Sequence, residues 1–484
     1  MGPHFTRQPS HGNRFDQSRL DRFYISGRGE WTYHIRTVDH QGARTLSDHV
    51  PIKLEVLLEA SEAASRPRRS YFKMDCKTLM KTDILARARA TWQEHPTWAK
   101  DKRKRWALAL GRIRKLLMEE LAEQCRRRCK ITWLKEDEAP SKYFFARLRA
   151  KHAQEEMTAL EVGSSQTIED PEEILEEVFR FYRDLYKAEE ETEEILESRR
   201  KVVGRIDRRI SPEENTLLEE TPSEELIITI VMEMPKEKSP DIDGVMIEIL
   251  RIGWEFMRED CFLMVQGFWG KKKLVGKDSK GVIKLIPKND RKQLLQNWRP
   301  ITLLTTTYKI VAKILAIRLK SMLPGIINTQ QTGFVAGRNI IDNILSLRLG
   351  QEWAHITGQD VIFVKLDFMK AYDRVAHGFL WDTLEAMGIG EETLLRIKGL
   401  IVGGSLEVHI NGNFTEDIQI GRGVRQGCPL APLLFAMTTQ PFMRALREEE
   451  KDGNIRGLNI GEDNALLHQL FADDTRICIT VEER

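Results

Sequence analysis

The order of apolar and polar positions along the chain separates regions of different periodicity. Residues 1–58 mix polar loops with strand-like runs such as Arg22–Ser26 and Val50–Val56. From Lys81 to about Lys151 the apolar residues recur at helical spacing, which predicts a long amphipathic helix with a basic outer face. The positions that set this spacing are Trp106, Leu110, Ile113, Leu117 and Leu121.

Helical patterns continue to about Gly270 and then give way to strands. An acidic helical pattern begins at Pro171, a residue suited to the first turn of a helix. Beyond Lys277 strands alternate with helices, and Gly281–Pro287 and Asp360–Phe368 are β-branched and aromatic runs of strand length. We therefore expect an α+β fold.

Charge adds a class of partner to this picture. The formal net charge is only +2, but residues 101–130 hold a strong local excess of lysine and arginine. Such an excess suits the phosphate backbone of a nucleic acid, and a solvated helix face explains it about as well. Hydrophobic residues make up 41% of the chain, which is ordinary for a globular protein and excludes wholesale disorder.

Cysteine usage and hydropathy bear on the cellular compartment. The six cysteines lack the short paired spacings of a zinc site or a disulfide framework, which favours a reducing environment. No apolar run approaches the roughly 20 residues that span a bilayer, so we expect an intracellular protein with no membrane partner. The basic run at 102–105 is compatible with nuclear localisation.

Asp367 is the first candidate for metal chemistry. It ends a strand that we expect to be buried, and a buried carboxylate needs a partner. A metal ion would serve, but so would Lys370, Arg374 or a helix N-terminus just after it.

Asp473 and Asp474 form the second acidic site. They separate two strand-like runs, 466–472 and 475–481, so we expect two negative side chains side by side at the turn of a hairpin. A divalent cation would remove their repulsion, although aspartate is also a favoured residue of surface turns.

Together these segments resemble the reverse transcriptases of non-LTR retrotransposons, particularly LINE elements of the plant type. The motifs that carry the resemblance are IKLIPK at 283–288, NWRPITLL at 297–304, QTGFVAGRNIIDNI at 331–344, KLDFMKAYDRV at 365–375, GVRQGCPLAP at 423–432 and FADDT at 471–475. The resemblance implies a right-hand polymerase with fingers and a palm, the palm being an antiparallel sheet backed by helices.

Carried over residue by residue, the resemblance implies a two-metal site. Asp367 and Asp473 would hold two Mg²⁺ ions, or Mn²⁺ in their place, with Asp474 as the adjacent and less direct third carboxylate. The primer 3′-hydroxyl would attack the α-phosphate of a bound dNTP, on an RNA template with a DNA primer. The implied activity is that of an RNA-directed DNA polymerase.

The same resemblance implies residues that bind the nucleotide. Tyr372 stands where the family has an aromatic side chain that excludes a 2′-hydroxyl, although helix packing is its simpler role. Gln426 and Gly427 stand in the loop that borders the incoming nucleotide.

Several basic and polar residues match the fingers motifs. Arg299, Lys284 and Lys288 stand at positions that could pair with the triphosphate, and a solvated face explains Lys284 equally well. Arg338 and Asn343 are either template-side or structural residues.

The resemblance extends towards the N-terminus. The segments SRLDRFYI and SDHVPI are similar to the closing strands of an apurinic endonuclease-like domain. In that family an Asp-His pair, here Asp48 and His49, helps to activate water beside a metal, and Asp21 belongs to the same remnant. The other ligands of such a site lie upstream in that family, so we expect no endonuclease activity.

We therefore expect four regions. They are an endonuclease-like remnant at 1–58, a basic helical linker at 59–165, a helical extension of the polymerase at 166–276, and the fingers and palm at 277–484.

The sequence ends at Arg484, soon after the acidic pair, so we expect no thumb and weak or absent processive synthesis. Two other classes of function stay open, a noncatalytic nucleic-acid-binding fragment and an inert retroelement relic. An unpaired strand at 477–481 would be a sticky surface, which leaves the oligomeric state open.

Overall fold

The computed structural model describes residues 31–40, 52–60, 82–94, 101–117, 157–163, 166–236, 245–288, 291–461 and 464–480. The chain divides into two compact units, Met1–Arg69 and Ser70–Arg484. In the first unit β1 (Trp31–His40) pairs antiparallel with β2 (Ile52–Ala60), which lies where the sequence predicted a strand. Asp21, Asp48, His49 and the run 22–26 lie outside the described residues.

Two N-terminal helices of the second unit pack into its main hydrophobic core. They are α2 (Thr82–Gln93) and the helix at 102–117. Trp92 and Trp106 meet edge to face at 5.4 Å, and the Trp92 indole donates a 2.9 Å hydrogen bond to Asp260. The helical spacing is confirmed from Trp106 to Leu117. The single helix expected to begin at Lys81 is two helices, 82–93 and 102–117, and residues 118–151 lie outside the described residues.

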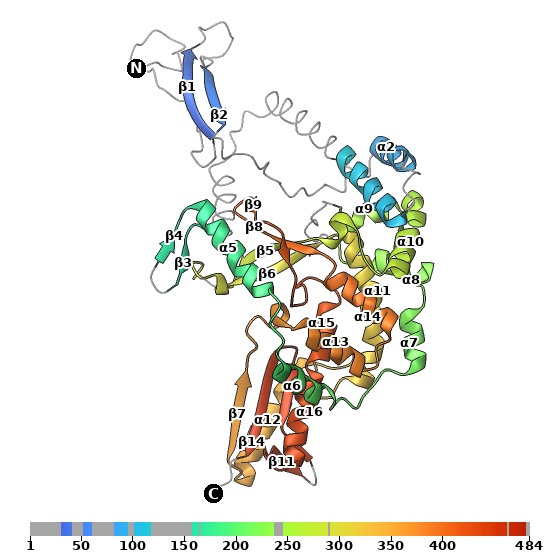
Figure 1. The fold of residues 1–484 in the computed structure, drawn as a ribbon, viewed down its shortest axis with the longest axis vertical. Helices are drawn as coiled ribbons and strands as arrows, with labels where there is room; N and C mark the ends of the chain where they lie inside the picture. Colours follow the sequence, from blue (N-terminus) through green and yellow to red (C-terminus); the bar gives the residue numbers. More distant parts are fainter. Residues whose placement is uncertain are drawn as a thin grey trace, which may run out of the picture. The chain divides into compact units, whose positions relative to one another are not determined.

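Helices form most of the second unit (Figure 1). They are α5 (Pro171–Tyr186), α6 (Glu193–Val203), α7 (Pro212–Glu219), α8 (Glu224–Glu233), α9 (Ile247–Ile252), α10 (Trp254–Lys271), α11 (Thr306–Ile326), α12 (Ile340–Thr357), α13 (His377–Ala386), α14 (Glu391–Ile401), α15 (Ala431–Thr438) and α16 (Gln440–Lys451).

Helix α5 begins at Pro171, as its sequence predicted. The carboxylate of Asp170 accepts hydrogen bonds from the backbone N–H groups of Glu172 and Glu173 and so caps the first turn. Its buried side chains, Ile174, Val178 and Tyr182 among them, pack on a five-stranded sheet. At the end of α5, Tyr186 contacts Asp373 in the short turn at 371–374.

The five-stranded sheet has the order β10-β8-β5-β6, with β9 paired to β8. Its strands are β5 (Gly281–Pro287), β6 (Trp298–Leu304), β8 (Ser405–Ile410), β9 (Asn413–Phe414) and β10 (Ile418–Gln419). The strand expected at 281–287 is confirmed, and it is buried because it lies between β6 and β8.

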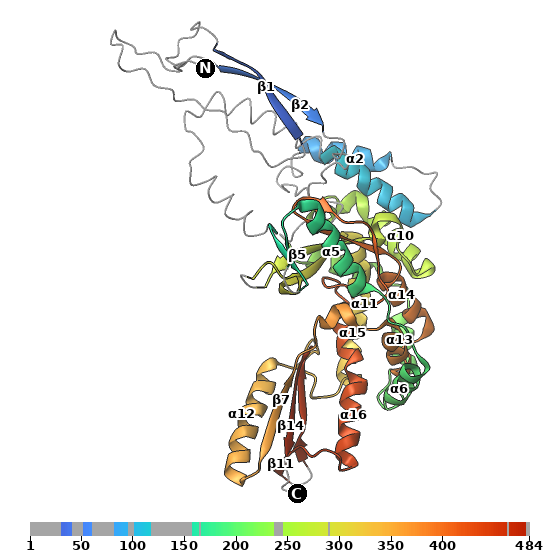
Figure 2. The same ribbon diagram turned by 60° about the vertical axis from the view of Figure 1, so that its left-hand side comes forward.

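A second, three-stranded antiparallel sheet has the order β13-β14-β7. Its strands are β13 (His468–Phe471), β14 (Asp474–Thr480) and β7 (Val361–Leu366). Figure 2 shows α12 on one side of this sheet and α16 on the other. Small hairpins pair β3 (Leu160–Val162) with β4 (Gln166–Ile168) and β11 (Leu458–Gly461) with β12 (Asn464–Leu466).

One expectation about this sheet is wrong. The strand before Asp367 is not buried, because β7 is an edge strand whose residues are partly or fully exposed. Strand β14 is the central strand, because it pairs with β13 on one side and β7 on the other. The order of pairing between distant segments decides both points, and a local pattern does not contain it.

The described part of the second unit is thus an α+β arrangement of helices with two larger sheets and two small hairpins. None of the helices in the described ranges is long and apolar enough to cross a lipid bilayer.

Candidate active site

Strand pairing brings two of the predicted aspartates to one end of the three-stranded sheet. Asp367 directly follows β7, and Asp473 lies in the tight turn between β13 and β14. Because Leu366 is opposite Thr475 in the antiparallel register, Asp367 and the turn that carries Asp473 lie at the same end of the sheet. Asp367 and Asp473 both line one cleft of about 670 Å³, the acidic cleft.

Asp474 behaves differently from its neighbour. It is the first residue of β14, is 58% exposed, and lies 3.4 Å from the ammonium of Lys365. It is not among the residues that line the acidic cleft, whereas Asp473 in the turn is.

The donor set fits a divalent cation that shares its ligands with a substrate. Within the described ranges no three His, Cys, Asp or Glu side chains gather into a metal site. Mg²⁺ in nucleotide enzymes is held by one or two carboxylates together with phosphate oxygens and water. Two carboxylates facing an open cleft meet that requirement, and a third is not needed.

The hairpin turn is held from outside by Gln331, a residue that the sequence analysis placed only within a motif. Its amide oxygen accepts from the backbone N–H of Ala472 at 3.0 Å, and its amide nitrogen donates to the Ala472 carbonyl at 3.2 Å. Ala472 has a φ of +56°, which is uncommon for a residue with a side chain. Gln331 is fully buried and so fixes the backbone beside Asp473.

The predicted nucleotide-binding residues separate into two groups. Tyr372, Gln426, Gly427 and Arg299 line the acidic cleft with the two aspartates. Lys284 does not line the cleft; its positive charge instead adds to burial in lowering the pKa of His409 to about 4.

Two other lysines occupy the cleft. Lys288 lines it, and so does Lys370, whose ammonium is buried without a hydrogen-bond partner among the described residues. The Lys370 ammonium lies 5.3 Å from the ring centre of Phe181 and 5.8 Å from that of Tyr182. Burial lowers the pKa of Lys370.

Tyr372 is one of the aromatic residues that line the cleft. Its ring packs on Phe435, with 4.8 Å between ring centres. Burial, and then the negative charge of Asp473, raise the pKa of the Tyr372 hydroxyl to about 12. The phenol therefore stays protonated at neutral pH and lies within electrostatic reach of Asp473.

The loop at 423–428 approaches the chain closely. Gly427 has a φ of +111°, and a Cβ there would collide with the carbonyl oxygen of Thr302. The N–H of Thr302 donates to the carbonyl of Gln426 at 2.7 Å, which ties the loop to β6. Glycine at 427 is thus required by both conformation and space.

Asp373 is the residue at this site that the sequence analysis missed. It is 0% exposed, and burial raises its pKa to about 6 despite hydrogen bonding and nearby lysines. Tyr186 and Gln426 donate to its two oxygens. Its place as a second acid within the motif at 365–375 is the signal that the sequence contains.

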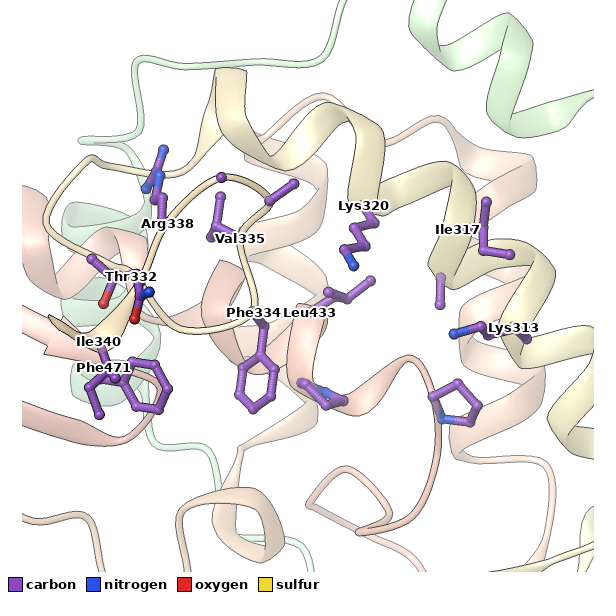
Figure 3. Close-up of a pocket in the computed structure, with 16 residues that line it drawn as sticks. Lys313, Ile317, Lys320, Thr332, Phe334, Val335, Arg338, Ile340, Leu433 and Phe471 are labelled. Carbon is purple, nitrogen blue, oxygen red and sulfur yellow. The ribbon is translucent and has the colours of Figure 1, made fainter. Parts of the chain in front are cut away.

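A second cleft of about 570 Å³ adjoins the first and shares Pro432 with it. Figure 3 shows Lys313 and Lys320 extending from α11 towards the loop that carries Phe334, which is 44% exposed at a φ of +62°. None of the residues described as lining it is acidic.

Arg338 and Asn343 have structural roles in this region. The Arg338 guanidinium donates to the carbonyls of Gln331 at 2.8 Å and Ile327 at 2.9 Å. Asn343 is buried and donates to the carbonyl of Leu470 at 2.9 Å, next to the hairpin turn.

Comparison with known proteins gives a consistent family. Residues 286–484 match the family model described as reverse transcriptase (RNA-dependent DNA polymerase). The transposon TX1 uncharacterized 149 kDa protein of Xenopus laevis is 33% identical over 341 residues, which is 69% of this chain and 25% of that protein.

Two further relatives come from insects. The Pol polyprotein of retrotransposable element R2DM of Drosophila melanogaster is 30% identical over 39% of this chain and 17% of its own length. The type-1 element R2 polyprotein of Popillia japonica is 30% identical over 39% of this chain and 26% of its own length. The chain thus spans about a quarter or less of these relatives.

Among solved structures, apo telomerase from Candida tropicalis aligns with a TM-score of 0.28 and 15% identity, over 43% of this chain and 45% of that chain. So low an overlap carries no argument, and the assignment rests on the family model and the sequence relatives. Residues 286–484 belong to the reverse transcriptase family, and the chain is similar to the polyproteins of non-LTR retrotransposons.

Proposed function

We propose that this chain is the RNA-directed DNA polymerase part of a retrotransposon polyprotein. In this reaction the 3′-oxygen of a DNA primer forms a bond to the α-phosphorus of a dNTP, pyrophosphate leaves, and the hydroxyl proton is lost to solvent. The observation that carries the proposal is that Asp367 and Asp473, from separate segments, line one cleft together with Tyr372, Gln426 and Arg299.

Asp367 and Asp473 are the residues that would hold the metal, most simply two Mg²⁺ ions or Mn²⁺ in their place. Bound there, divalent ions neutralise charge on the attacking and leaving oxygens of a phosphoryl transfer. The two carboxylates supply fixed negative oxygens, and the tight turn held by Gln331 keeps Asp473 in position. Asp474, paired with Lys365, contributes less directly.

The remaining residues of the acidic cleft suit a nucleoside triphosphate. Arg299 and Lys288 provide positive charge for its phosphates, and Tyr372 provides a rigid aromatic wall for its sugar. Lys284 has no part in this proposal because it does not line the cleft.

The second cleft suits the single-stranded template. Lys313 and Lys320 would pair with phosphates, and the exposed ring of Phe334 would stack on a base. In the same scheme the five-stranded sheet belongs to the fingers and the three-stranded sheet to the palm. Residues 1–58 would be the endonuclease-like remnant and residues 166–276 the helical extension of the polymerase. Within the expected linker 59–165, the helices at 82–93 and 102–117 pack into the main hydrophobic core.

The test is primer extension on an RNA template with Mg²⁺ and, separately, Mn²⁺. We expect Asp367→Asn and Asp473→Asn each to lower the rate of single-nucleotide incorporation by about 100-fold or more, because each removes a metal ligand. We expect Asp474→Asn to lower it by less than about tenfold, since its carboxylate faces Lys365.

Asp360→Asn is the matched control, because Asp360 precedes the same strand and does not line the cleft. Wild-type rates in the Asp473→Asn variant would contradict the proposal. A wild-type chain that binds the primer–template duplex without extending the primer would favour the noncatalytic binding fragment instead.

A further inference from the structure

Helix α5 lies outside the segment matched by the family model, yet its last residue contacts Asp373, which lines the acidic cleft. The hydroxyl of Tyr186 donates a 2.8 Å hydrogen bond to Oδ1 of Asp373. The side-chain amide of Gln426 donates a 3.1 Å hydrogen bond to Oδ2 of the same carboxylate. The buried carboxylate of Asp373 therefore joins α5, from outside the matched segment, to the loop at 423–428, which lines the acidic cleft.

Backbone hydrogen bonds fasten the same three segments together. The N–H of Gly421 donates to the carbonyl of Tyr186 at 2.8 Å, at the end of α5. The N–H of Gly423 donates to Val375 and that of Val424 to Tyr372, each at 2.7 Å. The loop is thus laid against both α5 and the segment that carries Asp373.

The arrangement at Asp373 is costly and specific. A buried carboxylate loses its hydration, and an apolar residue of similar size would fill the space without that cost. Here the negative charge has two hydrogen-bond donors and the nearby positive charges of Lys370 and Lys288. A residue whose only role was packing would not need such partners.

The chemistry of the carboxylate determines the orientation of the Gln426 amide. An ionised carboxylate accepts hydrogen bonds and donates none, so the amide must turn its nitrogen towards Asp373. The amide oxygen and the second N–H are then left for the acidic cleft, which Gln426 lines. A free glutamine would sample both orientations of its amide.

We infer that Asp373 is a positioning residue, through which Tyr186 of α5 holds the Gln426 amide in one orientation towards the incoming dNTP. This inference rests on the proposed polymerase function. It makes α5, which lies outside the matched domain, a working part of the nucleotide site.

The test compares Tyr186→Phe with Tyr182→Phe in the full chain. Both tyrosines are buried on α5, and each change removes one oxygen atom, so neither is expected to unfold the chain. The Tyr182 hydroxyl has no hydrogen-bond partner among the described residues, which makes it the matched control.

Single-nucleotide incorporation supplies the first measurement. We expect Tyr186→Phe and Asp373→Asn to raise the KM for dNTP by about tenfold, with kcat changed less than about threefold. Tyr182→Phe should change neither value. Asp373→Asn combined with Gln426→Ala should be no worse than Gln426→Ala alone, because the first residue acts through the second.

Amide hydrogen exchange supplies a second measurement that needs no catalysis. We expect faster exchange at residues 421–428 in Tyr186→Phe than in Tyr182→Phe or the wild type. If the wild type incorporates no dNTP, the polymerase proposal fails, while the exchange experiment still decides whether Tyr186 holds the loop. Equal KM and equal exchange in the two tyrosine variants, or additive effects in the double variant, would overturn the inference.

Discussion

At the scale of single residues, the aspartates around the acidic cleft differ in their surroundings rather than in their chemistry. Asp367 and Asp473 face the cleft, Asp474 faces Lys365 and solvent, and Asp373 is buried. The sequence argument for Asp367 relied on burial, and that premise is wrong. What favours a metal is two carboxylates converging on an open cleft from different segments.

Asp373 also predicts a pH dependence of stability. Its pKa is about 6 in the folded chain and near 3.8 when the chain is unfolded, so the folded state binds more protons between these values. Stability from this group is therefore present below about pH 4 and is lost as pH rises towards 6, by up to about 3 kcal/mol. The loss is expected in the wild type and absent in Asp373→Asn.

Urea unfolding at pH 4.5 and pH 7 measures this effect. The unfolding free energy of the wild type minus that of Asp373→Asn should become smaller as pH rises. Asp278 has a pKa raised in the same range, but it is present in both proteins and cancels in the difference. A difference that does not change with pH would show that Asp373 does not titrate as expected.

At the scale of elements, local patterns predicted the positions of strands well but did not predict which strands pair with one another. The run 281–287 and the hairpin around Asp473 are strands because β-branched and apolar residues repeat over a few positions. Their partners are decided by pairing across long stretches of sequence. That is why the exposure of β7, the central place of β14 and the reach of α5 into the site were not foreseen.

The candidate site divides in the same way. The aspartates and the 423–428 loop could be found because each stands in a short motif. The roles of Tyr186 and Gln331 could not be found, because each acts on a segment more than 100 residues away. Gln331 stands in the motif at 331–344, but nothing local shows which backbone it holds.

The hairpin turn predicts a sharp contrast between two glycines. A Cβ at Gly333 would collide with the backbone nitrogen of Ala472, so Gly333→Ala must displace the turn that carries Asp473. We expect it to lower the polymerase rate by at least about tenfold and the unfolding free energy by about 1–3 kcal/mol.

Gly325→Ala is the matched control for this substitution. Gly325 lies in the last turn of α11 with open space around its position, and alanine favours helix. We expect it to leave activity unchanged and to raise stability by up to about 1 kcal/mol. If Gly333→Ala matched Gly325→Ala in both measurements, the packing of this loop on the hairpin would be unimportant.

At the scale of the whole molecule, the matched domain is supported by helices that precede it. Trp92 and Trp106 share one hydrophobic core with α10 and α11, so the helices at 82–93 and 102–117 are packed onto the polymerase rather than merely connecting to it. The polar face of these helices carries the basic residues that the sequence singled out. Lys102, Lys104 and Lys115 are exposed there.

That face predicts a contribution to nucleic-acid binding that is separate from the two clefts. Each lysine that neutralises a phosphate releases a counterion, so its loss lowers the dependence of affinity on salt. Changing Lys102, Lys104 and Lys115 to Gln should reduce the slope of log K against log salt by up to about 3 for a primer–template duplex. Fluorescence anisotropy between about 50 and 200 mM salt measures that slope.

Changing Lys187, Lys201 and Lys451 to Gln removes the same charge from other exposed positions and should leave the slope nearly unchanged. If both triple variants lowered the slope equally, the loss would reflect net charge alone, and the basic helices would be a solvated face after all.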